Sequence, residues 1–292
     1  MTGTLLIFGF GFSAEAVWQR VRNSFDHCVT TTRSGDTFES ISAAGAEPVI
    51  FDGVSADGAM IRAVREATHI LVSIAPNEAG DPVINAFSNE IAAAGNLEWI
   101  GYFSTVGVYG DHDGAWVNEE TPCQPISKRS IQRINAETAW QAVAGKTGIP
   151  LAIFRLSGIY GPGRNAFVSM ERGRSRRLVK PGQVFNRIHR EDIAQAVDLA
   201  MEVKAAGIFN ITDDEPAPPQ DLVTFAHELA GREPPPEIDF ESADLSPMAR
   251  SFYGENKRVC NDKSKRVLGM RYAYPDYRTA LAAMWRDGNW KG

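Results

Sequence analysis

The first half of the chain alternates short apolar runs with amphipathic stretches. The runs are rich in Val, Ile, Thr and aromatic residues, a composition typical of buried β-strands. The stretches between them place apolar residues at helical spacing. The predicted strands are TLLIFG (4–9), CVTTTR (28–33), PVIFD (48–52), HILVSIA (69–75), WIGYFST (99–105) and LAIFRL (151–156).

This alternation predicts βαβ crossovers, and hence a parallel sheet covered by helices on both faces. After Leu156 the pattern changes to Gly-rich, basic and Pro-rich segments. We therefore expect an α/β protein with a Rossmann-type doubly wound parallel sheet over residues 1–160 and a smaller C-terminal substrate lobe over 161–292. The segment 186–213, which contains the strand GIFNIT, is expected to return to the first domain.

Composition narrows the class of protein. Hydrophobic residues make up 43% of the 292 residues and charged residues 23%, as in globular proteins. The formal charge of −6 gives no general attraction to nucleic acid or to an anionic membrane, so neither is an expected partner. The N-terminus lacks the pattern of a signal peptide, which predicts a cytoplasmic protein. The three cysteines and five histidines show no ligand spacing, so no metal site is expected.

A glycine-rich string, FGFGFSAEA, directly follows the first predicted strand and opens the first predicted helix. Its order, G-x-G-x-x-A, is that of a dinucleotide-binding loop in the required strand–loop–helix context. Gly9 would make the tight turn, and Gly11 and Phe12 would bring the backbone to a diphosphate at the helix N-terminus. Ala14 would permit close packing of helix on strand. A glycine turn of purely structural use is the alternative.

Two strand ends bear on the choice of cofactor. The second strand ends in Thr32 and Arg33, where an NAD-selective Rossmann fold usually has an acidic residue for the ribose hydroxyl. An arginine there suits the 2′-phosphate of NADP, so we favour NADP over NAD; a solvated loop arginine is the alternative. Asp52 could accept from the adenine amine or serve as a turn aspartate. The residues after the fourth strand that are expected beside the cofactor are Ser73, Ala75 and Pro76.

The string GYFSTVGVYGD (101–111) makes the pattern more specific. With RLSGIYGPGRN (155–165), RIHREDIA (187–194) and FNITDDEP (209–216), it resembles the extended short-chain dehydrogenase/reductases of the NAD-dependent epimerase/dehydratase family. That resemblance implies an oxidoreductase or epimerase that binds NADP or NAD and acts mostly on nucleotide sugars. It also implies a homodimer. The family's Ser/Thr, Tyr, Lys constellation would place its Ser/Thr at Thr105.

The chain departs from the family where the tyrosine and lysine should be. Counting back from Glu137, these positions hold Arg129 and Arg133, which resembles the atypical members of the superfamily. Arginine stays protonated, so Arg129 cannot exchange a proton at neutral pH, but it can stabilise negative charge. Arg133 could still bind the ribose or a phosphate. Alternatively, the pair binds an anion without chemistry, or both arginines lie on a solvated helix face.

The remaining site predictions concern the proton and the substrate. Tyr109, Tyr160 or a water could supply the proton that the family tyrosine would exchange, although packing is the usual role of tyrosines in VYG and IYG strings. We expect a small anionic, hydroxylated substrate such as a nucleotide sugar, and predict Ser104, Tyr160, Arg164 and Arg177 as substrate-binding residues. A solvated basic face is the alternative for the arginines of 172–180. A dinucleotide-binding sensor without turnover is the alternative function.

Overall fold

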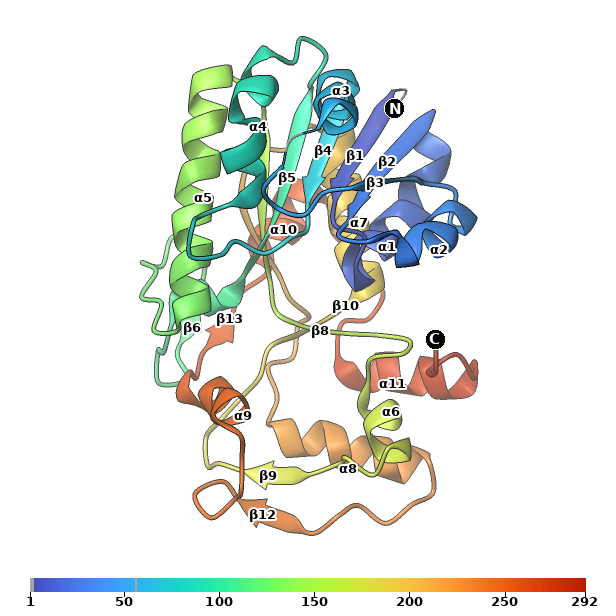
Figure 1. Cartoon of the computed structure of the whole chain (residues 1–292). Coiled ribbons are helices and arrows are strands. Elements are labelled where there is room, and N and C mark those ends of the chain that lie inside the picture. The colour runs from blue at the N-terminus through green and yellow to red at the C-terminus, as the bar shows by residue number, and fades with distance from the viewer. Residues whose placement is uncertain (1–2, 56) are drawn as a thin grey trace.

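The computed structural model describes residues 3–55 and 57–292, and a seven-stranded parallel sheet forms its upper part (Figure 1). The strand order is β11-β7-β5-β4-β1-β2-β3. The chain starts in the middle of the sheet and winds outward in both directions, as a doubly wound Rossmann-type fold does, which confirms the predicted fold class. The strands are β1 (Thr4–Phe8), β2 (His27–Thr32), β3 (Glu47–Ile50), β4 (His69–Val72), β5 (Trp99–Thr105), β7 (Leu151–Leu156) and β11 (Gly207–Ile211).

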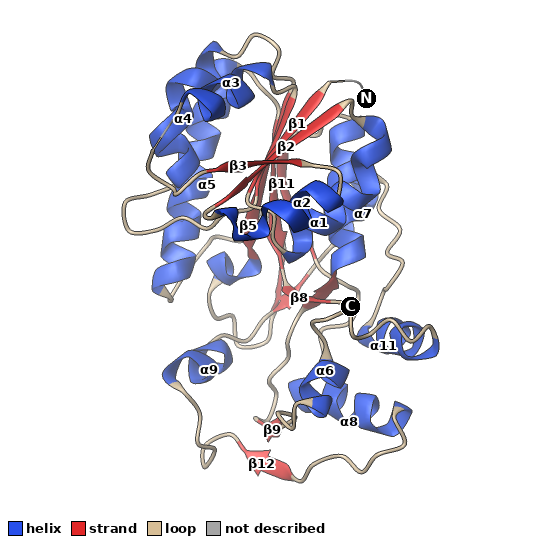
Figure 2. Ribbon diagram, turned by 45° about the vertical axis from the view of Figure 1, so that its right-hand side comes forward, coloured by secondary structure: helices blue, strands red, loops and turns tan. Residues whose placement is uncertain are grey.

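Helices cover both faces of this sheet (Figure 2). The central strands are buried along their whole length because apolar side chains point to both sides. On one face, α1 (Phe12–Val21) packs along α7 (Arg190–Glu202), with α2 (Phe38–Ala43) and α10 (Asp262–Leu268) beside them. On the other face lie α3 (Gly58–Glu66), α4 (Pro82–Ala93) and α5 (Lys128–Thr147), whose Trp140 is fully buried.

Side-chain caps fix where several helices begin. The side chain of Asp81 accepts hydrogen bonds from the amides of Val83 and Ile84 at the start of α4, and Ser127 caps α5 in the same way. By contrast, no side chain caps α1, which begins after Gly11. The first turn of α1 therefore leaves its backbone N–H groups for other partners.

The lower part of the molecule is built from segments that leave the sheet and come back (Figure 1). Three short parallel pairs organise it: β8 (Gly158–Tyr160) with β10 (Arg187–His189), β9 (Arg177–Val179) with β12 (Glu237–Asp239), and β6 (Trp116–Val117) with β13 (Arg258–Val259). We call this part the lobe. Its helices are α6 (Ala166–Glu171), α8 (Pro219–Leu229), α9 (Pro247–Ser251) and α11 (Tyr277–Arg286); 3₁₀ turns occur at 22–24, 35–37, 106–109 and 252–254.

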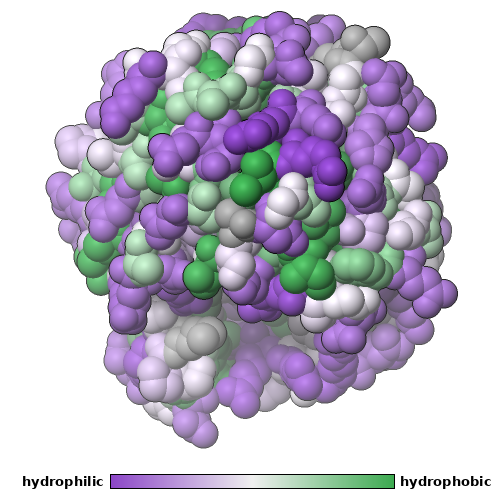
Figure 3. Space-filling model, turned by 45° about the horizontal axis from the view of Figure 1, so that its top comes forward, coloured by the Kyte–Doolittle hydropathy of each residue, from purple (hydrophilic) through white to green (hydrophobic). Residues whose placement is uncertain are grey.

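The surface agrees with a protein whose apolar residues are mostly buried. The face in Figure 3 is largely hydrophilic, with apolar side chains in small separate groups. Among the helices of the described segments, none combines the length and the hydropathy that a membrane span requires.

Candidate functional site

The glycine loop lies between β1 and α1, at the carboxyl end of the sheet. Gly9 has a φ of 91°, and a Cβ atom there would lie 2.5 Å from Cγ2 of Ile74. Its amide donates to Oγ1 of Thr31 at 2.9 Å, which fixes the turn. A Cβ atom on Gly11 would meet nothing within 4 Å. Gly9 is therefore required by the fold, whereas Gly11 keeps a free approach to the N-terminus of α1.

The end of β2 leaves Arg33 accessible. The hydroxyl of Thr32 donates to the carbonyl of Ser34 at 3.2 Å, and the Arg33 side chain projects into solvent. Asp52 behaves as a turn aspartate, because one carboxylate oxygen accepts from the amides of Val54 and Ser55, each at 2.8 Å. These hydrogen bonds hold the pKa of Asp52 below its usual value. Its contacts thus favour the turn role over adenine binding.

The segment after β4 lies against the glycine loop. The amides of Ser73 and Ile74 both donate to the carbonyl of Phe8, at 2.9 and 3.1 Å. Of the three residues predicted to lie beside a cofactor here, Ser73 is half-buried, Ala75 is exposed and Pro76 is buried. The structure therefore brings this segment and the loop together at one edge of the sheet.

Arg133 reaches the same edge from α5. Its Nη1 donates to the carbonyl of Phe103 at 2.6 Å, to Oη of Tyr102 at 3.1 Å and to the carbonyl of Ile74 at 3.5 Å. One nitrogen of the guanidinium is thus held at the ends of β4 and β5, while the planar group still has other donors. The solvated-face alternative does not describe Arg133.

Arg129, four residues earlier, has a different environment. Its side chain is exposed, and its guanidinium carbon lies 5.7 Å from the ring centroid of Phe252, which belongs to the lobe. Phe252 is itself 57% exposed. The residue at the family's tyrosine position thus extends from α5 toward the lobe, and its charge remains available to an anion.

Thr105 ends β5 and accepts a hydrogen bond from the amide of Gly107 at 3.1 Å. Because that bond uses a lone pair, the hydroxyl hydrogen of Thr105 can be donated to a ligand oxygen. The hydroxyl of Ser130, which the sequence did not point to, lies nearby. Both hydroxyls lie close to Gly107, because a Cβ atom there would be 2.8 Å from Oγ of Ser130 and 3.4 Å from Oγ1 of Thr105. Oγ of Ser130 accepts from Ser127 at 2.9 Å.

Ser104 and Tyr109 point into a buried polar network below this site. The Ser104 hydroxyl donates to Glu137 at 2.5 Å, and Glu137 also pairs with Arg155 at 2.7 Å. Tyr109 is fully buried, lies under the Arg155 guanidinium and donates to Asn210 at 2.7 Å. Burial raises the pKa of Tyr109 to about 12. These contacts favour structural roles for Ser104 and Tyr109 over the predicted substrate binding and proton transfer, because both hydroxyls are used inside the protein.

Tyr160 lies in the core of the lobe at the end of β8. Its ring packs edge-on against His189, the residue opposite it on β10, and its hydroxyl is buried without a protein partner. Burial raises the pKa of Tyr160, so the phenol stays protonated, and it lowers the pKa of His189 to about 4. Asp213 nearby has its pKa raised to about 8 by burial. The contacts of Tyr160 favour packing over exchange of a proton with solvent.

The basic run of the lobe is largely used by the lobe itself. Arg177 donates to Glu237 at 2.7 Å and to the carbonyl of Pro235 at 3.2 Å, and Arg176 donates to the carbonyl of Asp244 at 3.0 Å. Arg177 thereby joins β9 to β12, and these contacts favour a structural role over substrate binding. Lys180 also has a backbone partner, the carbonyl of Tyr253 at 2.5 Å.

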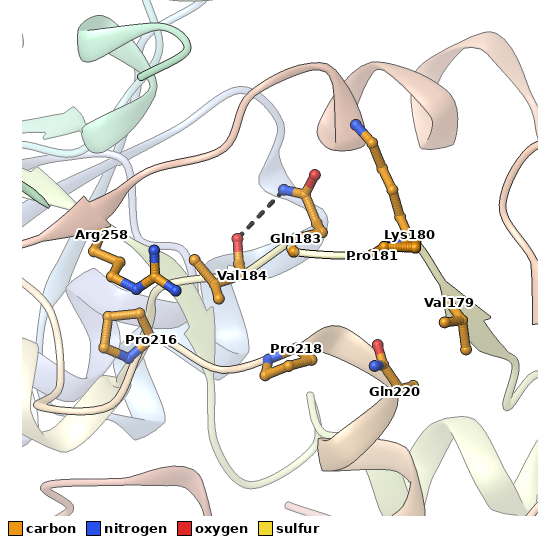
Figure 4. Close-up of a pocket in the computed structure, with 10 residues that line it drawn as sticks. Val179, Lys180, Pro181, Gln183, Val184, Pro216, Pro218, Gln220 and Arg258 are labelled. Atoms are coloured by element: carbon orange, nitrogen blue, oxygen red, sulfur yellow. Dashed lines mark hydrogen bonds between the residues drawn. The ribbon is translucent and has the colours of Figure 1, made fainter. Parts of the chain in front are cut away.

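A cavity of about 280 Å³ opens between the segment 179–184 and the start of α8 (Figure 4). Its walls are mostly apolar, with Pro216 and Pro218 on one side and Val179 and Val184 on the other. Oε1 of Gln220 points toward this space and has no protein partner, whereas the amide of Gln183 points away and donates to the carbonyl of Glu255 at 2.8 Å. A cavity of this size with a few polar groups suits a small ring-bearing ligand.

Arg164 lies beside the glycine loop. Its guanidinium carbon is 5.8 Å from the ring centroid of Phe12, and that of Arg190, which the sequence analysis did not single out, is 4.9 Å from the same centroid. Residues 3–55 and 57–292 contain no group of three His, Cys, Asp or Glu side chains that could hold a metal ion.

Comparison with known proteins identifies the family. The sequence profile described as "NAD dependent epimerase/dehydratase family" matches residues 88–212, which include Thr105, both α5 arginines and the β7–β11 region. Residues 88–212 therefore belong to the NAD-dependent epimerase/dehydratase family. In Rossmann-type folds a dinucleotide lies at the carboxyl ends of the strands, beside the loop that follows the first strand.

The chain is also similar to individual proteins at different distances. A solved structure from Silicibacter pomeroyi DSS, described as a functionally unknown conserved protein, is 48% identical, with 98% of this chain and 99% of that chain covered and a TM-score of 0.89. Protein YeeZ of Escherichia coli K12 is 31% identical over 202 residues, which are 63% of this chain and 62% of YeeZ. The alignment thus spans under two thirds of YeeZ.

A more distant structure shows how far the fold extends. UDP-glucuronic acid 4-epimerase from Bacillus cereus, solved with UDP-glucuronic acid and NAD, is 17% identical, with 97% of this chain and 98% of that chain covered and a TM-score of 0.77. At that identity the likeness concerns the fold alone. It extends over both the sheet and the lobe of this chain.

Proposed function

We propose that the protein is an NADP(H)-dependent oxidoreductase or epimerase that works without the family tyrosine. The observation that carries the cofactor part is the pairing of an open glycine loop with an exposed Arg33 at the end of β2. Gly11 leaves room for a diphosphate at the N-terminus of α1, and Arg33 offers a bidentate donor for a 2′-phosphate. No carboxylate stands at the position where NAD-selective folds bind the ribose hydroxyl.

The residues at this edge fit a nicotinamide dinucleotide, which supplies hydride transfer when it is bound. Gly11 and Phe12 would bring the backbone to its diphosphate, while Gly9 makes the turn and Ala14 lets α1 pack on the sheet. Arg133 would donate to its ribose. Ser73, Ala75 and Pro76 would line the same edge. Thr32 and Arg33 would select the phosphorylated nucleotide.

Thr105 and Arg129 would act on the substrate. The Thr105 hydroxyl has a free hydrogen to donate to a reacting oxygen, and the Arg129 charge would stabilise an anion that develops there. The proton itself would pass to water or to a group on the substrate, since the hydroxyls of Tyr109 and Tyr160 are buried.

The substrate we propose is a small anionic, hydroxylated metabolite of the nucleotide-sugar type. Support comes from the cavity beside Gln220, whose amide can pair with the polar edge of a ring. Arg129 is an exposed cation that could bind the anionic part. The resemblance to dimeric family members adds a homodimer to this proposal.

A sensor without turnover is the second candidate. The burial of the tyrosines near the site favours it. Tyr102 and Tyr109 are fully buried, and burial raises the pKa of each to about 12. Such groups do not exchange protons readily at neutral pH. A protein with the cofactor edge alone would report the nicotinamide pool by binding.

The test is a titration with NADPH and NADH that follows nicotinamide fluorescence in the wild type, Arg33→Ala and Arg65→Ala. Arg65 is an exposed arginine on α3 and serves as the charge-matched control. We expect NADPH to bind more tightly than NADH, and Arg33→Ala to weaken NADPH alone, by about tenfold or more. Absence of binding by both nucleotides would refute the proposal. Binding without hydride transfer across a panel of nucleotide sugars and carbonyl metabolites would favour the sensor.

A further inference from the structure

Two arginines from distant parts of the chain lie close to the first residue of α1. Arg190 is the first residue of α7, and its guanidinium carbon lies 4.9 Å from the ring centroid of Phe12, the first residue of α1. Arg164, from the loop between β8 and α6, reaches the same ring at 5.8 Å. Phe12 therefore holds two cations beside the glycine loop.

The backbone around Arg164 is fixed although its side chain is exposed. Gly161 and Arg164 exchange two amide-to-carbonyl hydrogen bonds, each of 3.0 Å, which close a tight loop. The side chain of Asn165 donates to the carbonyls of Gly161 and Trp290, at 2.9 and 2.7 Å. A long, exposed side chain is thus placed on a rigid base, as expected for a residue that reaches toward a ligand.

The electrostatics of this arrangement favour an anion. The N-termini of α1 and α7 meet at the contact of Phe12 and Arg190, so the positive ends of two helix dipoles lie together with two guanidinium groups. Among the described contacts of Arg190 there is one carboxylate. An oxygen of Glu191 lies 3.3 Å from Nε of Arg190, and the Glu191 side chain is 47% exposed. Asp192 is directed elsewhere, to the amides of Ala273 and Tyr274. Both guanidinium groups lie beside the same ring, so an anion bound there would be attracted by both.

We propose that Arg164 and Arg190 form a clamp that binds the diphosphate of the dinucleotide at the start of α1. The inference rests on the proposed function, since it assumes that the glycine loop binds a dinucleotide. It adds that residues far along the chain complete the cofactor site: the loop supplies backbone N–H groups, and Arg164 and Arg190 supply bidentate donors.

The test separates the diphosphate from the 2′-phosphate. Calorimetric titrations use NADPH, ADP-ribose, which has the diphosphate without the 2′-phosphate, and 2′,5′-ADP, which has the 2′-phosphate without the bridging diphosphate. The variants are Arg164→Met, Arg190→Met and Arg190→Lys, with Arg65→Met as the control for lost charge. Methionine keeps an apolar stem for packing and removes the donors.

We expect each methionine variant to weaken ADP-ribose by about tenfold and to change 2′,5′-ADP less than twofold, whereas Arg33→Ala gives the opposite pattern. Arg190→Lys should fall in between, because it keeps the charge and loses the planar fork. UDP-glucose is titrated as a further ligand. If the methionine variants bind UDP-glucose more weakly and ADP-ribose as the wild type does, the assignment of the clamp to the dinucleotide is overturned.

Other outcomes also decide. If the wild type binds ADP-ribose and both methionine variants bind it within twofold of the wild type, the clamp is wrong while the proposed function stands. If the wild type binds none of these nucleotides, both fall. If Arg190→Met shows no thermal unfolding transition, it has not folded. Arg164→Met and Arg190→Lys then test the clamp in its place.

Discussion

Replacing Glu137 tests whether a buried ion pair holds the site helix in place. Glu137 lies on α5, the helix that carries Arg129 and Arg133, and its carboxylate accepts from Arg155 of β7 at 2.7 and 3.2 Å. The side chains of the pair are only 3% and 2% exposed. Glu137→Gln keeps the volume but leaves the Arg155 charge buried without a counter-charge. Removal of one partner from such a pair costs about 3–5 kcal/mol of unfolding free energy.

Urea denaturation followed by tryptophan fluorescence measures this cost, because Trp140 lies one turn further along α5. The double variant Glu137→Gln, Arg155→Met removes both charges and should recover most of the loss, to within about 2 kcal/mol of the wild type. Arg20→Met, which breaks the surface pair of Arg20 and Asp198, is the control and should cost less than about 1 kcal/mol. The reasoning is refuted if Glu137→Gln costs no more than this control, or if the double variant is as unstable as the sum of the single variants.

Three further predictions follow from single contacts. Gly9→Ala should lower the unfolding free energy by about 1–3 kcal/mol, because the residue has a φ of 91° and its new Cβ would meet Ile74. Gly11→Ala should instead keep the fold and weaken NADPH binding. Denaturation and NADPH titration of both variants check this. Asp213→Asn should be more stable than the wild type at pH 8 and gain nothing at pH 4. Burial raises the pKa of Asp213 to about 8, so the contribution of its protonated form to stability is complete below the unfolded pKa and is lost as pH rises through 8. Equal differences in unfolding free energy at the two pH values would contradict this. Arg177→Met should leave UDP-glucose binding unchanged and lower stability by about 1 kcal/mol or less, since its guanidinium serves Glu237 and Pro235; a tenfold loss of binding would restore it to the site.

The periodicity of the sequence was sufficient for the fold class. The predicted strands 4–9, 28–33, 99–105 and 151–156 overlap β1, β2, β5 and β7, because buried parallel strands need continuous β-branched and aromatic runs that few other elements tolerate. The division into 1–160 and 161–292 stays a prediction. Local signals also placed the glycine loop, since its turn and its helix are contiguous in the chain.

The side-chain roles were harder to predict because they depend on distant partners. Whether Tyr109 faces a substrate depends on Asn210, which is 101 positions away and accepts its hydroxyl. In the same way, the role of Ser104 depends on its hydrogen bond to Glu137, and the role of Arg177 depends on its hydrogen bond to Glu237. Arg190 carried no signal of its own, because its meaning comes only from the contact of α7 with α1. A motif gives the type of residue at a position, while the partner that uses each donor is a matter of tertiary structure.

The return of the chain to its sheet bears on how such a protein can change in evolution. The excursions 161–186 and 212–257 leave the carboxyl ends of the strands, form most of the lobe and come back to β10 and β13. The first joins β8 to β10, which pair with each other, and the second joins β11 to β13, which pair with β7 and β6. Substrate preference could therefore drift through changes in these two insertions, while the winding of the sheet and its nucleotide edge are inherited intact. The same connectivity means that a cut at residue 160 would separate β11 from β7, so neither half would be a viable module for recombination.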